Sequence, residues 1–216
     1  MSVSATVVIS CAGLGTRLGL GIPKSLLDFG GRPLIQWQLR MLNAVDDVRV
    51  VVGFRAEEII RAARAIRDDL TFVYNHRYAA TGTAHSLYLG ARFAPGDVIS
   101  LDGDLVVSPD DFRNWISTPG RRIGVSEPRS SDPVYVTVGD EPNSAVGFSR
   151  TQGRWEWTGM LRLPASEICQ HDGHVFQMLE DALPIETAMI DCMDVDTAAD
   201  YEVARERYRS MFDDGA

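Results

Sequence analysis

A β-branched run that leads straight into a glycine-rich loop is the feature that most constrains how this chain folds. Residues 6–9 are Thr-Val-Val-Ile, a pattern typical of a buried strand. They are followed by Ser10-Cys11-Ala12-Gly13-Leu14-Gly15-Thr16-Arg17-Leu18. Two glycines one residue apart let the backbone approach an anion, and successive amide groups can then hold phosphate oxygens. Because Arg17 and Lys24 follow closely and can neutralise the same charge, we predict a nucleoside triphosphate site here.

Three other interpretations of this loop were weighed. A dinucleotide-binding turn has the pattern G-x-G-x-x-G, but Leu18 stands at the third glycine position and Pro23 interrupts the helix that should follow. A P-loop is disfavoured because no Gly-Lys-Ser or Gly-Lys-Thr occurs at the required spacing. A glycine turn with a purely structural role stays open, since such turns are common in α/β domains.

The loop and the residues after it resemble the signature of nucleotidyltransferases with a GT-A-like fold. The resemblance rests on Ala12-Gly13-Leu14-Gly15-Thr16-Arg17-Leu18, on Pro23-Lys24 and on Gly31-x-Pro33-Leu34-Ile35. That superfamily includes the sugar-1-phosphate nucleotidyltransferases and the phosphocholine and phosphonate cytidylyltransferases. The stretch between Leu18 and Pro23 is shorter here than in many sugar-phosphate members, which weakens assignment to those members.

Length and charge narrow the class of protein. A chain of 216 residues is expected to form one large domain with a sizeable core. The formal net charge of −9 disfavours nucleic acid as a partner, because nucleic-acid-binding surfaces are basic. No apolar run approaches the roughly 20 residues that span a bilayer, and the first residues show no secretory pattern. We therefore expect no membrane partner and a cytoplasmic location.

Apolar β-rich runs alternate with helical patterns, which predicts an α/β fold. With the resemblance, we expect a Rossmann-like, GT-A-type three-layer sandwich with a mixed, mostly parallel central sheet and a small antiparallel extension. The strands expected first are 3–9, 48–52, 71–74 and 97–101, and the helices between them are 34–42, 56–67 and 83–93. Shorter strands are expected at 122–126, 135–138, 146–149 and 158–163, with helices at 175–183 and 198–211.

We expect a single nucleotidyltransferase domain over residues 1–212. Residues up to about 110 form its nucleotide-binding half in this interpretation, and 111–190 form its acceptor-binding half. Residues 191–212 supply a loop that completes a metal site, followed by the C-terminal helix. A homodimer is compatible with the sequence but is not required by it.

An aspartate pair follows the fourth expected strand, in Asp102-Gly103-Asp104. Ligands of open α/β sheets bind outside the carboxyl ends of the strands, and Mg²⁺ is usually held by one or two carboxylates plus substrate phosphates. The resemblance assigns Asp104 to the metal. Asp102 lies two residues earlier on the same strand face, so it could assist. The alternative is that Asp104 is a turn or cap residue.

A second acidic cluster precedes the C-terminal helix and resembles the closing D-x-D-T-x-x-D element of the superfamily. By that resemblance an aspartate here completes the Mg²⁺ site. We favour Asp196, and Asp194 is the alternative. A structural role is also open, in which Asp196 or Thr197 caps the helix and Asp200 stabilises its first turn.

The segment 75–87 is where the superfamily contacts the base. Asn75-x-x-Tyr78 followed by Ser86-Leu87-Tyr88 resembles the phosphocholine-type cytidylyltransferases, whereas Thr81-Gly82-Thr83-Ala84 is closer to the sugar-phosphate type. CTP is favoured on this basis, and the base stays open. The residues predicted to bind the nucleotide are Cys11, Ala12, Gly13, Gly15, Thr16, Arg17, Thr81, Gly82, Thr83, Ser86 and Asp102.

The resemblance implies attack by a phosphate or phosphonate monoester on the α-phosphorus of the NTP, with loss of pyrophosphate. Such an acceptor is already anionic, so catalysis needs positioning and charge stabilisation rather than a base. Arg17 and Lys24 are the predicted catalytic residues. Arg17 would hold the β- and γ-phosphates with the loop, and Lys24 would bridge the α-phosphate and the acceptor.

The acceptor site is predicted from the later half of the chain, at Glu127, Tyr135, Trp157 and Gly159. Trp155-Glu156-Trp157 suggests an aromatic wall with an acid, which would suit a cationic head group. Packing of these tryptophans against a second subunit is an equal alternative.

Three other functions are alternatives to transfer of CMP from CTP; the first stays open, and the sequence disfavours the other two. The first is a sugar-1-phosphate nucleotidyltransferase that uses UTP, dTTP or GTP. The second is a catalytically silent nucleotide-binding module, which the presence of Arg17, Lys24, Asp104 and Asp196 disfavours. The third is a dinucleotide oxidoreductase, which Leu18 and Pro23 disfavour.

Overall fold

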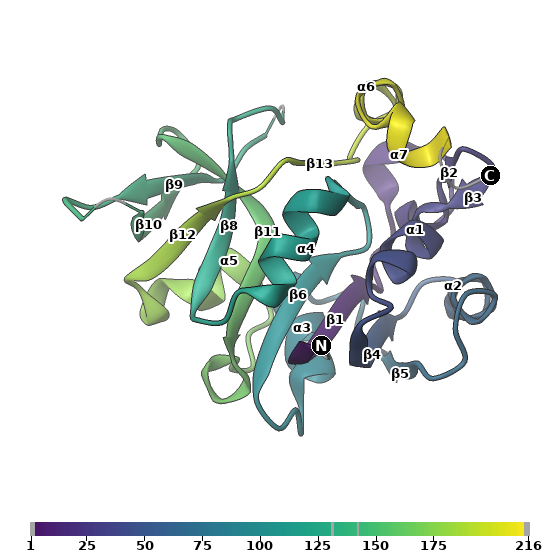
Figure 1. Ribbon diagram of the computed structural model, residues 1–216, viewed down its shortest axis with the longest axis horizontal. Coiled ribbons are helices and arrows are strands. Elements are labelled where there is room, and N and C mark those ends of the chain that lie inside the picture. Colours follow the sequence, from purple (N-terminus) through teal and green to yellow (C-terminus); the bar gives the residue numbers. More distant parts are fainter. Residues whose placement is uncertain (1–2, 131, 142, 214–216) are drawn as a thin grey trace.

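A mixed sheet runs through the molecule in this computed structural model, which describes residues 3–130, 132–141 and 143–213. In the described residues the sheet has nine strands in the order β5-β4-β1-β6-β11-β8-β12-β10-β9. Figure 1 shows the two ends of this sheet at opposite sides of the molecule, β5 at one and β9 at the other. The prediction of an α/β fold with a mixed sheet is confirmed.

The half of the sheet that is built from the first part of the chain is parallel. Its strands are β1 (Val3–Cys11), β4 (Val45–Val52), β5 (Thr71–Tyr74) and β6 (Asp97–Asp102). β1 pairs in parallel with β4 on one side and with β6 on the other. Because a central parallel strand is buried on both faces, it is rich in β-branched residues, as Val7, Val8 and Ile9 show with no exposed area.

The other half is mostly antiparallel and larger than the small extension expected. It comprises β8 (Arg122–Ser126), β9 (Tyr135–Val138), β10 (Ser144–Ser149), β11 (Trp155–Pro164) and β12 (Ile185–Met189). β11 joins the halves, because it pairs antiparallel with both β6 and β8. Thus five of the nine strands in the described residues belong to this half, and they continue the central sheet.

Helices cover both faces of the sheet and make it the middle of three layers. α1 (Leu34–Met41), α2 (Ala56–Arg64) and α4 (Pro109–Ser117) share one apolar cluster with Val7 and Ile9 of β1. α3 (Thr83–Ala91) and α5 (Val175–Leu179) share the other cluster with Val8. This division follows from the alternation of side chains along a strand.

The C-terminal segment of the chain packs beside elements from its first forty residues. β13 (Cys192–Asp194) pairs antiparallel with β7 (Leu105–Val107), and α6 (Ala198–Arg207) and α7 (Arg209–Asp213) follow it. In Figure 1 these two helices lie beside α1 and the small ribbon of β2 (Asp28–Phe29) and β3 (Arg32–Pro33). Phe212 packs against Phe29 and Trp37 there, with ring centroids 4.8 and 5.3 Å away. This return places the second acidic cluster next to the glycine loop.

Several boundaries differ from the prediction. α4, β7, β12 and β13 were not predicted, and the expected helix 175–183 is α5 followed by a short 3-10 turn, Glu180–Ala182. The expected helix 198–211 is divided into α6 and α7 at Tyr208. A further 3-10 turn, Ala165–Glu167, follows β11. None of the helices in the described ranges has the length and apolar character to cross a membrane.

Candidate active site

A cavity of about 700 Å³ opens at the carboxyl ends of β1 and β6, where ligands of α/β sheets bind. Most of the predicted site residues lie on its wall: Cys11, Ala12, Gly13, Gly15, Thr16, Lys24, Thr81, Gly82, Thr83, Ser86, Asp102, Asp104, Trp157, Gly159, Asp194 and Asp196. Among the described side chains, Glu127 and Tyr135 are not on this wall. Arg17 belongs to the 3-10 turn Thr16–Leu18, and its side chain lies outside the described part of the protein.

The glycine loop leaves the end of β1 and folds back over Lys24. Gly15 has φ +62°, and a Cβ there would lie 3.3 Å from Cγ of Lys24. At Gly13 no heavy atom of the described residues lies within 4 Å of an added Cβ. The backbone at Gly13 therefore faces open space on the cavity wall, as a phosphate-binding loop requires.

Lys24 lies between two carboxylates. It begins the 3-10 turn Lys24–Leu26, directly after Pro23. Its Nζ donates to Oδ2 of Asp104 at 2.7 Å and also to Asp196. Burial disfavours the ammonium, but the two carboxylates outweigh it and hold the pKa of Lys24 above its ordinary value. Lys24 is therefore a fixed positive charge on the cavity wall.

Two more carboxylates, those of Asp102 and Asp194, line the cavity beside this pair. Burial and the nearby charge of Asp104 raise the pKa of Asp102 to about 8. The same two causes raise the pKa of Asp194 well above its ordinary value. Burial is the larger cause of both shifts, and the part that comes from neighbouring carboxylates is the part that a bound cation would oppose.

The donor set suits Mg²⁺ in number and chemistry. Among the described residues no three His, Cys, Asp or Glu side chains form a metal-binding group as they stand. However, Asp104 and Asp196 share one ammonium, so their oxygens converge on one place. Mg²⁺ requires only one or two carboxylates when phosphates and waters complete its shell. The assignment of Asp104, Asp194 and Asp196 to a metal stays a prediction.

Two glycines explain how closely the aspartates approach the loop. A Cβ at Gly103 would lie 2.6 Å from Sγ of Cys11 and 2.9 Å from the carbonyl oxygen of Ser10. Gly159 has φ +79°, and a Cβ there would lie 2.4 Å from Oδ2 of Asp102. Since neither position has room for a side chain, Gly103 directly after β6 can lie against the end of β1, and Gly159 in β11 can lie against Asp102.

The predicted base-contacting segment is held by its own Asn75 and by one distant part of the chain. Asn75 Nδ2 donates to Oγ of Ser86 at 3.1 Å and to Oγ1 of Thr81 at 3.2 Å. The amide of Gly82 donates to the carbonyl of Asp172 at 2.7 Å, and a Cβ at Gly82 would lie 2.3 Å from the carbonyl oxygen of Gly173. Asp172 and Gly173, shortly before α5, thus pack against the loop that leads into α3.

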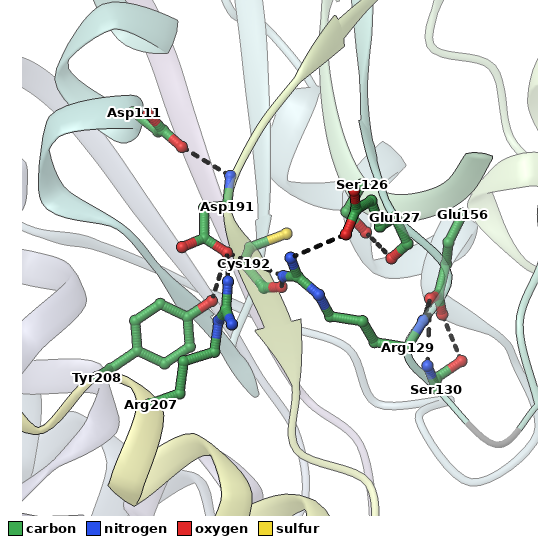
Figure 2. Close-up of polar contacts among 10 residues, drawn as sticks. All are labelled: Asp111, Ser126, Glu127, Arg129, Ser130, Glu156, Asp191, Cys192, Arg207 and Tyr208. Atoms are coloured by element: carbon green, nitrogen blue, oxygen red, sulfur yellow. Dashed lines mark hydrogen bonds and ion pairs between the residues drawn. The ribbon is translucent and has the colours of Figure 1, made fainter.

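The predicted wall of two tryptophans and an acid, expected to bind the acceptor, is not formed as one surface. Trp157 and Glu156 line the cavity, but Trp155 is not among the described lining residues. The carboxylate of Glu156 accepts hydrogen bonds from the amides of Arg129 and Ser130, at 2.6 and 3.2 Å, and from the Ser130 hydroxyl (Figure 2). Since Glu156 is used to hold this loop, the three residues do not form one free wall for a cationic group.

Other cavity residues were missed by the sequence analysis. Arg150 pairs with Asp132 at 3.4 Å, and its guanidinium carbon lies 5.2 Å from the ring centroid of Phe176. All three line the cavity, together with Ser130 and His174. No motif links them, because they come from separate loops and one helix that only the fold brings together.

The fold and the cavity together define an α/β nucleotidyltransferase, and the comparison with protein families agrees. A family described as the MobA-like NTP transferase domain matches residues 7–143, more than half of the sequence, and the chain belongs to this family. The predicted superfamily and enzyme class are therefore confirmed. The match includes the glycine loop, Lys24 and Asp104.

A named protein that is similar in sequence agrees with this family assignment. The bifunctional protein GlmU of Methanococcus vannielii is 26% identical over 200 residues, which covers 87% of this chain and 45% of that protein. The chain thus spans less than half the length of that relative.

Two solved structures share the fold at 19% identity each. The inositol-1-phosphate CTP transferase of T. maritima gives a TM-score of 0.81, with 100% of this chain and 98% of that chain covered. The CTP:phosphocholine cytidylyltransferase LicC of Streptococcus pneumoniae gives 0.76, with 94% and 98% covered.

Proposed function

We propose that this NTP transferase moves a nucleoside monophosphate, CMP from CTP first among the candidates, onto a small phosphate or phosphonate acceptor with Mg²⁺. The observation that carries the proposal is the position of Lys24, which stands between Asp104 and Asp196 below a glycine loop on one cavity wall. This arrangement puts positive charge and a cation-binding carboxylate pair where a triphosphate would lie.

The transfer itself needs no general base. An acceptor oxygen forms a bond to the α-phosphorus while the bond from the α-phosphorus to the β-bridging oxygen breaks, and pyrophosphate leaves. The loop amides and Arg17 hold the β- and γ-phosphates. Lys24 reduces the repulsion between the α-phosphate and the anionic acceptor, which is electrostatic stabilisation by a preorganised group.

The carboxylates of Asp104 and Asp196 would hold Mg²⁺, with Asp194 as the alternative to Asp196. The ion supplies positive charge that stabilises the α-phosphate and the departing pyrophosphate. A cation bound by these carboxylates competes with Lys24 for them, which would free the ammonium for the phosphates. This exchange would reconcile an acidic chain of net charge −9 with a polyanionic substrate.

Each part of the chain has a distinct task in this proposal. Residues 1–110 bind the nucleotide, 111–190 bind the acceptor, and 191–212 complete the metal site. Trp157 and Gly159 support the acceptor assignment because they line the cavity near Asp102. Glu127 and Tyr135 keep a predicted acceptor role without a place on the described wall.

The choice of CTP rests on the Asn75-x-x-Tyr78 and Ser86-Leu87-Tyr88 patterns and agrees with the CTP named for both solved structures. One observation favours a second candidate. Thr81-Gly82-Thr83-Ala84 resembles the sugar-phosphate type, so a sugar-1-phosphate nucleotidyltransferase that uses UTP, dTTP or GTP is the alternative.

Pyrophosphate release tests the proposal. The four common NTPs and dTTP are each combined with Mg²⁺ and with phosphocholine, phosphoethanolamine, 2-aminoethylphosphonate and several sugar 1-phosphates. We expect release with one NTP–acceptor pair, and a loss of about 10² or more in kcat for Lys24→Ala.

Arg55→Ala is the matched control. Arg55 Nη1 donates to the carbonyl of Gly21 in the same loop at 2.8 Å, but Arg55 is not among the described cavity residues. We expect it to keep most of the activity. Absence of NTP binding by calorimetry, or turnover that Lys24→Ala leaves intact, would overturn the proposal.

A further inference from the structure

Arg129 lies between two segments that carry different halves of the site. The 127–130 loop follows β8 and brings Ser130 to the cavity wall. β13 ends at Asp194, Asp196 follows two residues later, and both aspartates line the same cavity. Figure 2 shows the guanidinium of Arg129 extending from the loop toward β13, with Glu156 behind the loop.

The contacts of Arg129 reach both segments. Its amide donates to Oε2 of Glu156 at 2.6 Å, which anchors the loop on β11. Its Nη1 donates to Oδ1 of Asp191 at 2.9 Å and to the carbonyl of Cys192 at 3.3 Å. One side chain thus joins the loop to the beginning of β13.

Arg129 is not placed to contact substrate. Within the described residues it does not line the large cavity. It lines a separate hollow of about 20 Å³ behind the cavity, together with Glu156, Asp194 and Asp200. Arg129 is the cation among the described residues of that hollow, where three carboxylates converge.

Asp191 is a rigid anchor for this contact. Its carboxylate also accepts hydrogen bonds from Nη2 of Arg207 at 2.8 Å and from the hydroxyl of Tyr208 at 3.2 Å. Its amide donates to Oδ2 of Asp111 in α4 at 2.7 Å. Isolated surface ion pairs contribute little, but a network with shared acceptors and backbone contacts holds its members in one geometry.

We propose that Arg129 is a positioning residue that couples the 127–130 loop to β13 and the residues directly after it, which carry Asp194 and Asp196, so that acceptor binding and the carboxylate geometry are set together. This inference rests on the proposed function for its effect on turnover. The physical reason is that group transfer requires the two reacting phosphates to be held within a fraction of an ångström, and a loop alone holds them poorly.

Hydrogen–deuterium exchange without substrates tests the coupling directly. Arg129→Gln removes both contacts to β13 but keeps the amide that binds Glu156. We expect exchange to rise about fivefold or more in peptides covering both 127–130 and 190–196. Arg207→Gln is the matched control, because Arg207 binds the same Oδ1 of Asp191 from α6. It is expected to leave the 127–130 peptide unchanged.

A second variant distinguishes loosening of the 127–130 loop from loosening of β13. Glu156→Gln weakens the anchor of the loop without touching Asp191, so we expect faster exchange at 127–130 together with a smaller change at 190–196. If Arg129→Gln leaves exchange at 190–196 at the wild-type rate, the coupling is overturned, whether or not the enzyme turns over.

Kinetics and Mg²⁺ binding give the functional readout. Mg²⁺ binding is measured as the Mg²⁺ concentration that gives half of the maximal rise in melting temperature. For Arg129→Gln we expect this concentration and the KM for acceptor to increase together, each about fivefold or more. The KM for NTP is expected to stay near the wild-type value. A change in the KM for acceptor alone, or in Mg²⁺ binding alone, would contradict the coupling. If the wild-type protein itself shows no turnover, the proposed function is overturned instead.

Discussion

Lys24 is the only lysine in the sequence, whereas arginine supplies all the other cationic side chains apart from histidine. Its two carboxylate partners lie 80 and 172 residues further along the chain. An ammonium is a compact charge with rotatable donors, so it can exchange carboxylate partners for phosphate oxygens more easily than a planar guanidinium can. The difference explains why arginine would be a poor replacement at this one position.

The choice between Asp194 and Asp196 can be made with two isosteric variants. Asp196 shares the ammonium of Lys24 with Asp104, so its oxygen already lies where a cation would bind. We expect Asp196→Asn to raise the half-saturating Mg²⁺ concentration about tenfold or more, and Asp194→Asn to raise it less. Turnover as a function of Mg²⁺ concentration measures this. A larger effect of Asp194→Asn would reverse the assignment.

Helix capping supplies the control for that experiment. Thr197, rather than Asp196, caps α6, and Asp200 completes the capping box by accepting from the amide of Thr197 at 2.7 Å. Asp200→Asn should therefore lower stability through the helix start while changing the Mg²⁺ requirement little. An equal rise in Mg²⁺ requirement for Asp200→Asn would show that the first test measures folding instead.

The site residues that could be predicted are those in continuous motifs. Gly13, Gly15, Lys24 and Asp104 each follow a strand or precede a turn within a short stretch of sequence, so their spacing carries the information. Arg150, by contrast, reaches the cavity because its own loop, Asp132 and Phe176 converge in space. No local pattern encodes that convergence, so it could not be predicted.

At the scale of elements, the parallel half was predictable because each strand is a short apolar run bounded by turn residues. The strand at 71–74 matches residue for residue. α4 was missed although Ser108, Pro109, Asp110 and Asp111 form a strong helix start. β13 is three residues long, too short for a periodic pattern to be distinguished, whereas β12 was missed although its five residues are enough for one.

Within β4, one ion pair predicts how stability depends on pH. Asp47 accepts from Arg49 Nη2 at 2.7 Å and from the Thr6 hydroxyl at 2.8 Å. Arg49 first, and Thr6 after it, hold the pKa of Asp47 below its ordinary value although burial opposes them. A lowered pKa stabilises the fold above the unfolded-state value near 3.9, and this stability is lost as pH falls through the folded-state pKa.

Asp47→Asn is therefore expected to lower the melting temperature at about pH 7. The difference from the wild type should shrink as pH falls below about 4, because the wild-type carboxylate then becomes protonated too. Thermal unfolding at a series of pH values measures both curves, with the exposed Asp68→Asn as control. A difference that stays constant down to the lowest pH would contradict the ion-pair account.

At the scale of the whole molecule, the return of the chain to its beginning was not predictable. The helical pattern after residue 197 showed that a helix forms, but nothing in it showed that Phe212 would pack on Phe29 and Trp37. This packing fixes the segment that begins with Asp196 against the segment that contains Lys24. The candidate site therefore depends on a contact between the two ends of the chain.

Phe212→Ala tests that dependence. Phe212 is 4% exposed, and removing a buried phenyl ring costs about 3 kcal/mol or more. We expect that loss in the free energy of unfolding in urea, and a much smaller one for the neighbouring, half-buried Met211→Ala. Equal effects of the two variants would show that the aromatic cluster does not hold α7.

Transfer of labelled phosphate tests the central claim most directly. The NTP that supports turnover is labelled in separate reactions at its α- and its γ-phosphate, and each is incubated with Mg²⁺ and acceptor. For nucleotidyl transfer we expect the α-label to appear in the product with the acceptor and the γ-label to leave in pyrophosphate. Appearance of the γ-label in the acceptor would mean phosphoryl rather than nucleotidyl transfer, and would contradict the account.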